Sequence, residues 1–329
     1  MLRKILFILL PVCTLVMPAE AQTGILHSLD SMLGRWQSDR TSRYDTAYIG
    51  KPVERWTVKL RLNMSGTGLD TRGNTSVGAF ESRLETEPKA TVGASVSYRG
   101  LSLALSLNPA KLSGRNKDYE LNLTSYGNRM GAELSLLSSR TFSGTVVMGG
   151  TESTVPAGQV GMKMIQGSAY YAFSHRRFSF PAAFSQSQVQ KRSCGSWLLG
   201  LSAFAGSINA DGVMAADNSD ADISIINVAV GGGYAYNLVT RRRWLVHGSV
   251  VPAIVVYSRT RLTVGGIHRR SPMRFPMFNN VGRLAVVRSF GKRFAGLSAV
   301  VSLWHQGDSD RLQMESLKWR ARVFYGFRF

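Results

Sequence analysis

A histidine and a serine separated by one residue, His247 and Ser249, have the types and the spacing that catalysis could use. Residues two apart on a β-strand lie on the same face, so the imidazole could act as general base for the hydroxyl in the hydrolysis of a lipid ester. A pair this short is a weak signal. It fits better a polar contact on the inner face of a sheet, opposite to the face of Trp244 and Val246. We therefore keep an enzyme as an alternative.

The sequence predicts no metal ion and no cofactor. The five histidines are scattered, and none has a second ligand at a spacing typical of metal sites. The run Gly231–Gly233 lies inside a strand pattern, which is not the strand-to-helix turn where glycines cradle phosphate. The acidic stretch from Asp211 to Asp222 lacks the spacing and the closing glutamate of an EF-hand, so it is typical of a solvated loop.

Four basic residues near the two ends of the chain offer a different chemistry, the binding of anions. Lys59 and Arg61 alternate with apolar residues in WTVKLRLNM, and Arg320 and Arg322 do so in WRARVFYGFRF. Alternation places each pair on one face of a strand. If the first and last strands of a closed sheet meet, the four charges share one wall, where small anionic solutes could bind.

The elements that must position these residues follow an export signal. Two basic residues precede an apolar run from Ile5 to Met17, and a small-residue A-x-A site follows, which is the pattern of a signal peptide over residues 1–21. Export argues against nucleic acid as the partner of this basic chain, whose formal net charge is +20. No later apolar run is long enough for a membrane helix, and the one cysteine left after cleavage, Cys194, allows no disulfide within the chain.

Alternation recurs along the rest of the chain and predicts an all-β fold, a transmembrane antiparallel β-barrel of about twelve strands. Segments of about ten residues place apolar side chains on one parity and Ser, Gly, Asn and Thr on the other. In a soluble sandwich the outward face would be charged instead. Short turns are expected on one side of the barrel, and long loops on the other side at residues 65–88, 108–117, 139–160, 207–221, 258–275 and 305–313.

The last strand carries a signal of its own. Val323, Tyr325, Phe327 and Phe329 occupy alternate positions and are expected to face lipid, which leaves Arg328 facing the lumen. This ending resembles the terminal strand that the barrel assembly machinery of the outer membrane recognises. The chain thus divides into a signal peptide (1–21), a periplasmic segment with a short amphipathic helix (22–54) and the barrel (55–329).

The charges of the lumen allow two arrangements. Glu120 and Glu133 are expected to face inward from strands well around the circumference from the basic wall. Separated charges would give the transverse field of a porin constriction. Paired charges, or a plug such as the N-terminal helix with Asp30 and Asp39, would close the lumen.

Three stretches resemble a known family. They are the run Asp45 to Ile49, the strand that begins at Trp56, and the long basic and aromatic connection at residues 175–196. Together they resemble an uncharacterised family of outer-membrane barrels from Bacteroidota-type bacteria. The resemblance implies an outer-membrane barrel over most of the chain, and it implies no substrate and no catalytic residue.

We therefore predict a protein of the cell outer membrane, a non-enzymatic channel or binding barrel with a basic lumen. The alternatives are an outer-membrane enzyme acting on lipid or lipopolysaccharide, and a structural or adhesive surface barrel. The expected partners are outer-membrane lipid and lipopolysaccharide, the barrel assembly machinery and small anionic solutes.

Overall fold

The computed structural model describes residues 44–54, 56–75, 78–98, 101–107, 118–210, 221–264, 267–271, 277–308 and 312–329. The predicted signal peptide and the amphipathic helix of the N-terminal segment lie outside these ranges, as does most of the acidic stretch that begins at Asp211. Within the described ranges, no helix is both long and apolar enough to cross a bilayer.

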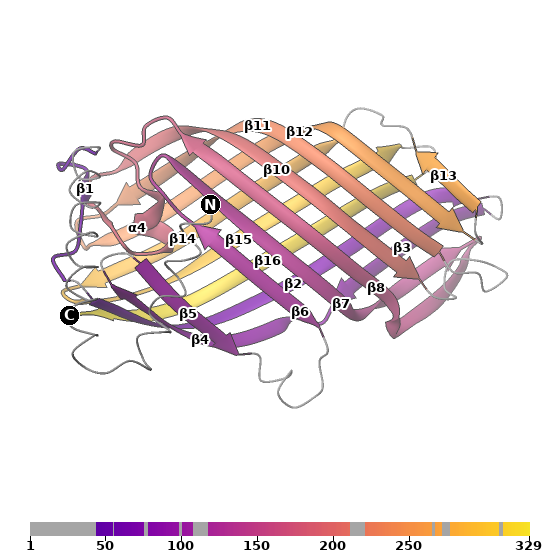
Figure 1. Ribbon diagram of the computed structural model, residues 1–329, viewed down its shortest axis with the longest axis horizontal. Coiled ribbons are helices and arrows are strands. Elements are labelled where there is room, and N and C mark those ends of the chain that lie inside the picture. Colours follow the sequence, from indigo (N-terminus) through magenta and orange to yellow (C-terminus); the bar gives the residue numbers. More distant parts are fainter. Residues whose placement is uncertain are drawn as a thin grey trace, which may run out of the picture.

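The described chain is built almost entirely from β-strands (Figure 1). The helix α4 (Phe180–Phe184) lies in the long connection between β8 and β10. The strands are β1 (Ile49–Gly50), β2 (Trp56–Thr75), β3 (Gly78–Thr86), β4 (Lys89–Tyr98), β5 (Leu101–Leu107), β6 (Tyr119–Ser125), β7 (Met130–Met148), β8 (Thr151–Ala172), β9 (Val189–Gln190), β10 (Cys194–Ala210), β11 (Ala221–Val239), β12 (Trp244–Val264), β13 (Ile267–Ser271), β14 (Phe278–Phe290), β15 (Arg293–Asp308) and β16 (Leu312–Arg328).

Ten of these strands close into an antiparallel ring, in the order β16-β15-β14-β12-β11-β10-β8-β7-β3-β2, and β2 pairs again with β16. At the closure, Trp56 and Phe329 exchange two backbone hydrogen bonds, with N–O distances of 2.9 and 3.0 Å. The ring has no free strand edge along its closed part, which β3 completes between β2 and β7, and among the described strands no pairing joins β5 to β6. The predicted all-β antiparallel barrel is therefore confirmed.

The strand number differs from the prediction, because about twelve strands were expected around the ring and it holds ten. The difference arises at β2, a strand of 20 residues that pairs along one half with β3 and along the other half with β4. β3 pairs with β7 and closes the ring. β4 and β5 extend the sheet beside it, and β6 pairs with the first part of β7.

A buried ion pair marks the place where the ring meets these extra strands. Lys89, the first residue of β4, lies 2.9 Å from Asp118, which directly precedes β6. Asp118 also accepts hydrogen bonds from the hydroxyls of Ser139 and Thr141 and from the backbone N–H of Arg140, where the β7–β8 pairing is irregular. The starts of β4 and β6 are thus fixed to one point of β7.

The two ends of the barrel are different. The end that we call the turn end holds Trp56, Phe329 and the tight connections at residues 126–129, 240–243 and 291–292, and it lies on the left of Figure 1. We call the opposite end the loop end. The loop end also has a tight turn, residues 149–150 between β7 and β8. Tight turns face the periplasm in bacterial outer-membrane barrels, so the turn end, with three of the described tight turns, is the expected periplasmic side.

The polarity of the wall reverses along the barrel. Toward the turn end the outward side chains are apolar, and Leu60, Leu199 and Val323 are 50–59% exposed. Toward the loop end outward side chains such as Lys163 and Arg261 are charged. The inward side chains of that half form an apolar cluster that includes Leu69, Leu84, Phe142, Met162, Phe204, Ile225 and Trp304. An apolar exterior suits lipid and a polar exterior suits water, so we expect the loop-end half to stand clear of the bilayer.

This reversal explains why several of the predicted long loops are wrong, while the predicted loop at residues 108–117 lies outside the described ranges. Residues 139–160 were expected to form a loop, but β7 continues to Met148 and β8 begins at Thr151. β2, β10, β12 and β15 likewise extend into stretches expected as loops. Their outward positions are polar because they face water, and that hides the alternation by which a membrane strand is recognised.

Candidate functional site

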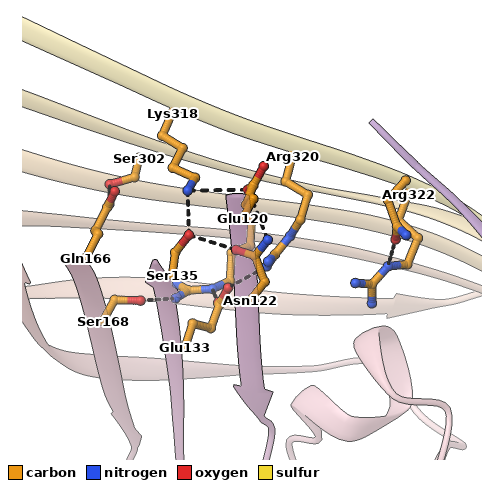
Figure 2. Close-up of polar contacts among 12 residues, drawn as sticks. Glu120, Asn122, Glu133, Ser135, Gln166, Ser168, Ser302, Lys318, Arg320 and Arg322 are labelled. Carbon is orange, nitrogen blue, oxygen red and sulfur yellow. Dashed lines mark hydrogen bonds and ion pairs between the residues drawn. The ribbon is translucent and has the colours of Figure 1, made fainter. Parts of the chain in front are cut away.

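A band of charged and polar side chains crosses the lumen within the half of the barrel that is apolar outside (Figure 2). Glu133 on β7 is at its centre. One carboxylate oxygen lies 2.7 Å from Nε of Arg283 on β14, and the other lies 3.0 Å from Nη2 of Arg320 on β16. These strands are not neighbours in the ring, so the ion pairs span the lumen. All three side chains are at most 15% exposed.

A second carboxylate, that of Glu120 on β6, extends the band. It lies 3.4 Å from Nζ of Lys318 and accepts hydrogen bonds from Ser65 at 2.9 Å and from Asn122 at 3.0 Å. Lys318 also donates to Ser135, whose hydroxyl donates to Asn122. Figure 2 shows Glu120, Asn122, Ser135 and Lys318 joined in one network. Such a network holds the strands in one arrangement, because each group that is left unpaired in the interior costs free energy.

The four residues predicted to form a basic wall lie on the inward parity of β2 and β16, which are neighbours. Three of them have separate partners, and the fourth, Arg61, lies near the like charge of Arg320. Arg320 pairs with Glu133, Arg322 donates to Oδ1 of Asn63 at 2.6 Å, and Lys59 reaches toward the turn end. Of the two arrangements considered for the lumen, the described side chains show the paired one, in which Glu120 and Glu133 form ion pairs with inward cations.

Cations still outnumber carboxylates on the inner wall. The inward carboxylates of the described strands and their ends are Asp118, Glu120 and Glu133. The inward cations are Lys59, Arg61, Lys89, Arg283, Lys318, Arg320, Arg322 and Arg328. The excess gives the interior a net positive charge.

Two cavities inside the described lumen are small. One has a volume of about 50 Å³ and lies within the polar band, lined by residues that include Asn122, Glu133, Gln166, Ser302 and Lys318. Another of about 10 Å³ lies between the band and α4. The larger of the two has room for a few water molecules. On both sides of the band, buried apolar side chains fill the described lumen.

Residues 173–193 fold back into the turn end, and we call them the plug segment. Ser179 caps α4 by accepting a hydrogen bond from the N–H of Ala182. Pro181 lies in the first turn of the helix, where backbone N–H groups have no partner within the helix, so the missing N–H of proline costs nothing there. All five residues of α4 are buried, and the ring of Phe180 lies 4.1 Å from that of Tyr170. In Figure 1, α4 lies within the turn end of the barrel.

A tyrosine of the turn 126–129 also contacts the plug segment. Tyr126 stacks on Phe184 with ring centroids 5.0 Å apart. Burial, and next the negative charge of Glu133, raise the pKa of the Tyr126 hydroxyl above its usual value. The hydroxyl stays neutral at physiological pH and hydrogen-bonds to Glu133, so Tyr126 joins the plug segment to the polar band.

Gln186 fastens the plug segment to the strands at which the ring closes. It is buried and has a positive φ of 56°, a conformation that costs a residue other than glycine about 1–3 kcal/mol. Its side-chain oxygen accepts a hydrogen bond from Lys59 at 2.8 Å, and its backbone oxygen accepts one from Arg328 at 3.0 Å. Two cations from β2 and β16 thus hold the end of α4.

The predicted catalytic pair has a third member, Asn237 on β11. Asn237 donates to the backbone oxygen of Ser179 and to Gln190, so its own oxygen faces Nδ1 of His247, which donates at 2.7 Å. Nε2 of His247 then accepts from the hydroxyl of Ser249 at 3.2 Å. The order of groups is that of a serine–histidine–asparagine relay.

The surroundings of this relay make it part of the plug contact. His247 is fully buried, and its ring lies 5.0–6.0 Å from the rings of Phe178, Phe180 and Phe184. The plug segment therefore covers the approach to Ser249. In the described conformation, the hydrogen-bonded chain Gln190–Asn237–His247–Ser249 joins the plug segment to the wall.

The expected lipid-facing residues of the last strand lie on the outer surface. Val323, Tyr325, Phe327 and Phe329 are 38–59% exposed, while Arg328 is buried inside. Their role in assembly remains a prediction. Among the described residues, no group of three His, Cys, Asp or Glu side chains could hold a metal ion.

The sequence matches the model of a domain of unknown function, DUF4421, over residues 43–329. The chain belongs to the DUF4421 family. This confirms the resemblance to an uncharacterised barrel family. In this DUF4421 chain, the two stretches outside the ring that carried the resemblance are paired with each other: Ile49 of β1 lies opposite Gln190 of β9 in the plug segment.

The chain is also similar to solved structures at low sequence identity. The outer-membrane protease OmpT of Escherichia coli has 6% identity and a TM-score of 0.46, with 84% of this chain and 97% of that chain covered. The translocator domain of the autotransporter NalP of Neisseria meningitidis has 11% identity and a TM-score of 0.30, with 95% and 100% covered. The outer-membrane protein OprG of Pseudomonas aeruginosa has 8% identity and a TM-score of 0.28, with 84% and 97% covered. No curated protein matches the sequence.

Several residues of the site were not predicted. Lys318 shares the parity of Arg320 and Arg322, so the alternation of the last strand could have included it. Arg283 lies in a segment with apolar residues on both parities, so alternation gives its direction no support. Asn237 lies beside His247 because of the register between β11 and β12, and Gln190 reaches Asn237 because of the path of the plug segment. No spacing in the sequence predicts either contact.

Proposed function

We propose that this DUF4421 protein is a sealed outer-membrane surface barrel, which acts through its projecting half and does not conduct solutes in the described conformation. The observation that carries this proposal is the filling of the lumen. The apolar cluster closes the loop-end half, the ion pairs of Glu133 cross the middle, and the plug segment occupies the turn end. This favours the structural or adhesive function over a channel.

The outer membrane suits the outside of the barrel. The apolar outer zone of the turn-end half continues around the ring, with aromatic side chains such as Trp56, Trp197 and Tyr325 exposed near its edge. Aromatic girdles of this kind lie at the membrane interface. With the tight turns in the periplasm, the polar loop-end half projects from the cell, where a rigid, water-exposed wall can contact other molecules.

A second candidate function is the binding and passage of small anionic solutes. It is favoured by the excess of cations around the cavity of about 50 Å³ in the polar band. Passage would require both the plug segment and the apolar cluster of the loop-end half to move. The candidate therefore needs a conformation more open than the described one.

Conductance in planar bilayers separates the two candidates. The wild-type barrel is compared with a variant in which residues 175–191 are replaced by a short Gly/Ser linker. A sealed surface barrel gives near-zero conductance in both proteins, because the apolar cluster of the loop-end half remains. A stable anion-selective pore in the linker variant would favour the second candidate, and stable pores in the wild type would contradict the first.

A further inference from the structure

A row of cationic and hydroxyl side chains crosses the outer surface of five neighbouring strands. Lys163 on β8 lies opposite Ser207 on β10, Ser207 opposite Ser224 on β11, and Ser224 opposite Arg261 on β12. The register places these four positions on one line across the strands. Two further cations flank them on the outer surface, Arg140 on β7 and Arg259 on β12.

The row lies at the border between the apolar and the polar parts of the outer wall. On the turn-end side of the row, Ile165, Ile226 and Val256 are 42–55% exposed. On the loop-end side, Asn209 and Asp222 face outward and bond to each other. A border of this kind coincides with the headgroup level of the outer leaflet when the turn end faces the periplasm.

The cations of the row are available for a ligand. Among the residues that the structure describes, no carboxylate forms an ion pair with Arg140, Lys163, Arg259 or Arg261. The nearby carboxylate of Asp222 is engaged by Asn209. The side chain of Arg140 lies over Gly161 of β8. A Cβ atom at Gly161 would be 3.6 Å from Cγ and 3.7 Å from Nε of Arg140. Arg140 therefore lies against the strand that carries Lys163.

The distance between the cations of the row allows them to bind two anionic groups of one lipid headgroup. Neighbouring strands are about 4.8 Å apart, so the columns of Lys163 and Arg261, three strands apart, are separated by about 14 Å. Two serine hydroxyls lie between them and can donate hydrogen bonds. Guanidinium and ammonium groups bind phosphate through charge-assisted hydrogen bonds.

We propose that Arg140, Lys163, Ser207, Ser224, Arg259 and Arg261 form a binding site for the phosphate groups of a phosphorylated glycolipid of the outer leaflet. We call these residues the phosphate row. The site rests on the proposed orientation of the barrel in the outer membrane, but its chemistry can be tested in detergent. The proposed ligand is one lipid class among the partners expected of an outer-membrane protein, and its contacts lie on five strands.

The turn end supplies a matched control, because it carries exposed cations of its own. Arg241, Arg242, Arg243 and Lys292 lie in the connections at residues 240–243 and 291–292, at the opposite side of the proposed bilayer. A quadruple variant of these residues removes the same number of charges as a quadruple variant of the phosphate row. General electrostatic attraction of the lipid would be weakened equally by both variants.

The experiment measures binding of purified lipopolysaccharide to the folded protein in a neutral detergent, with enzymatically dephosphorylated lipopolysaccharide in parallel. Changing Arg140, Lys163, Arg259 and Arg261 to Gln is expected to weaken binding about tenfold, and the turn-end variant less than about twofold. Wild-type protein should bind the dephosphorylated lipid as weakly as the row variant binds the intact lipid. Heat-modifiable gel mobility checks that both variants are folded.

Three results would overturn the assignment. Equal losses in the two variants would indicate unspecific charge attraction, and undiminished binding of dephosphorylated lipid would show that phosphate is not the recognised group. Displacement of the lipid by inorganic phosphate at equal concentration would identify a site for free phosphate rather than for a lipid headgroup.

Discussion

Glu133 on β7 and Arg320 on β16 form an ion pair of 3.0 Å across the lumen, although β2 and β3 separate their strands in the ring. Arg283 approaches the same carboxylate from β14. One buried carboxylate therefore connects three parts of the wall. The Glu133 carboxylate neutralises two cations in an interior with little water. Its loss should therefore destabilise the barrel more than the loss of either arginine.

Replacing Glu133 by Gln should destabilise the barrel strongly. The change keeps the size of the side chain but leaves Arg283 and Arg320 buried without a counter-charge, which costs about 3–5 kcal/mol in the free energy of unfolding. Urea unfolding followed by heat-modifiable gel mobility measures it. The control is Glu81→Gln, because Glu81 pairs with Arg72 at 3.3 Å while 48% exposed, and its loss should cost less than about 1 kcal/mol. Equal losses would show that the lumen pair is effectively solvated.

Replacing Lys59 by Met should loosen the plug segment and leave the wall intact. Met retains the apolar stem but cannot donate to Gln186 or to the backbone oxygen of Ser185. We expect faster hydrogen–deuterium exchange at residues 173–193 and unchanged exchange in β10 and β11. Lys292→Met, at an exposed lysine of a tight turn, should change neither region. Unaltered exchange in the Lys59 variant would mean that aromatic packing alone holds the plug segment.

The fold class of this chain can be predicted from the sequence, but most contacts inside its lumen cannot. Alternation depends on local contact with lipid or lumen, so the outward direction of Leu60 or Val323 can be read from single strands. The same rule fails where the strands leave the bilayer, because Phe142 and Trp304 then face inward and polar residues face water. The partners of Lys59 and His247 lie on the plug segment or across a strand pair, and only the folded path of residues 173–193 brings Gln186 and Gln190 to them.

Replacing Asn237 by Ala should separate a structural role from a catalytic one. The change leaves His247 Nδ1 and the backbone oxygen of Ser179 without a buried partner, which should cost about 1–3 kcal/mol in the free energy of unfolding. The side-chain oxygen of Gln190 loses one of its two donors and keeps the backbone N–H of Ser179. Ser249→Ala removes one hydroxyl at the end of the chain and should cost less. Urea unfolding measures both losses.

Assays with phospholipid and lipopolysaccharide test the catalytic alternative on the same variants. We expect no hydrolysis by the wild type. Hydrolysis that Ser249→Ala abolishes while the barrel stays folded would show that the plug segment uncovers an active site.

Deleting Phe329 should lower the amount of folded barrel in the outer membrane far more than Arg328→Ala does. Phe329 is the last outward aromatic of β16, is 54% exposed, and pairs through its backbone with Trp56 where the ring closes. Its loss removes both the terminal aromatic expected to be recognised during assembly and two hydrogen bonds of the closure. Arg328 faces inward and binds the backbone oxygen of Gln186, so its replacement should loosen the plug segment after the barrel has formed.

Folded and unfolded species can be separated by gel mobility without heating in membranes from cells that express each variant. Refolding of the purified variants into detergent supplies the control, because it omits the assembly machinery. The deletion should fold in detergent with a modest loss of stability, while its level in cells falls severely. Similar levels of folded protein for the two variants in cells would show that the C-terminal aromatic is not the feature that assembly reads in this strand.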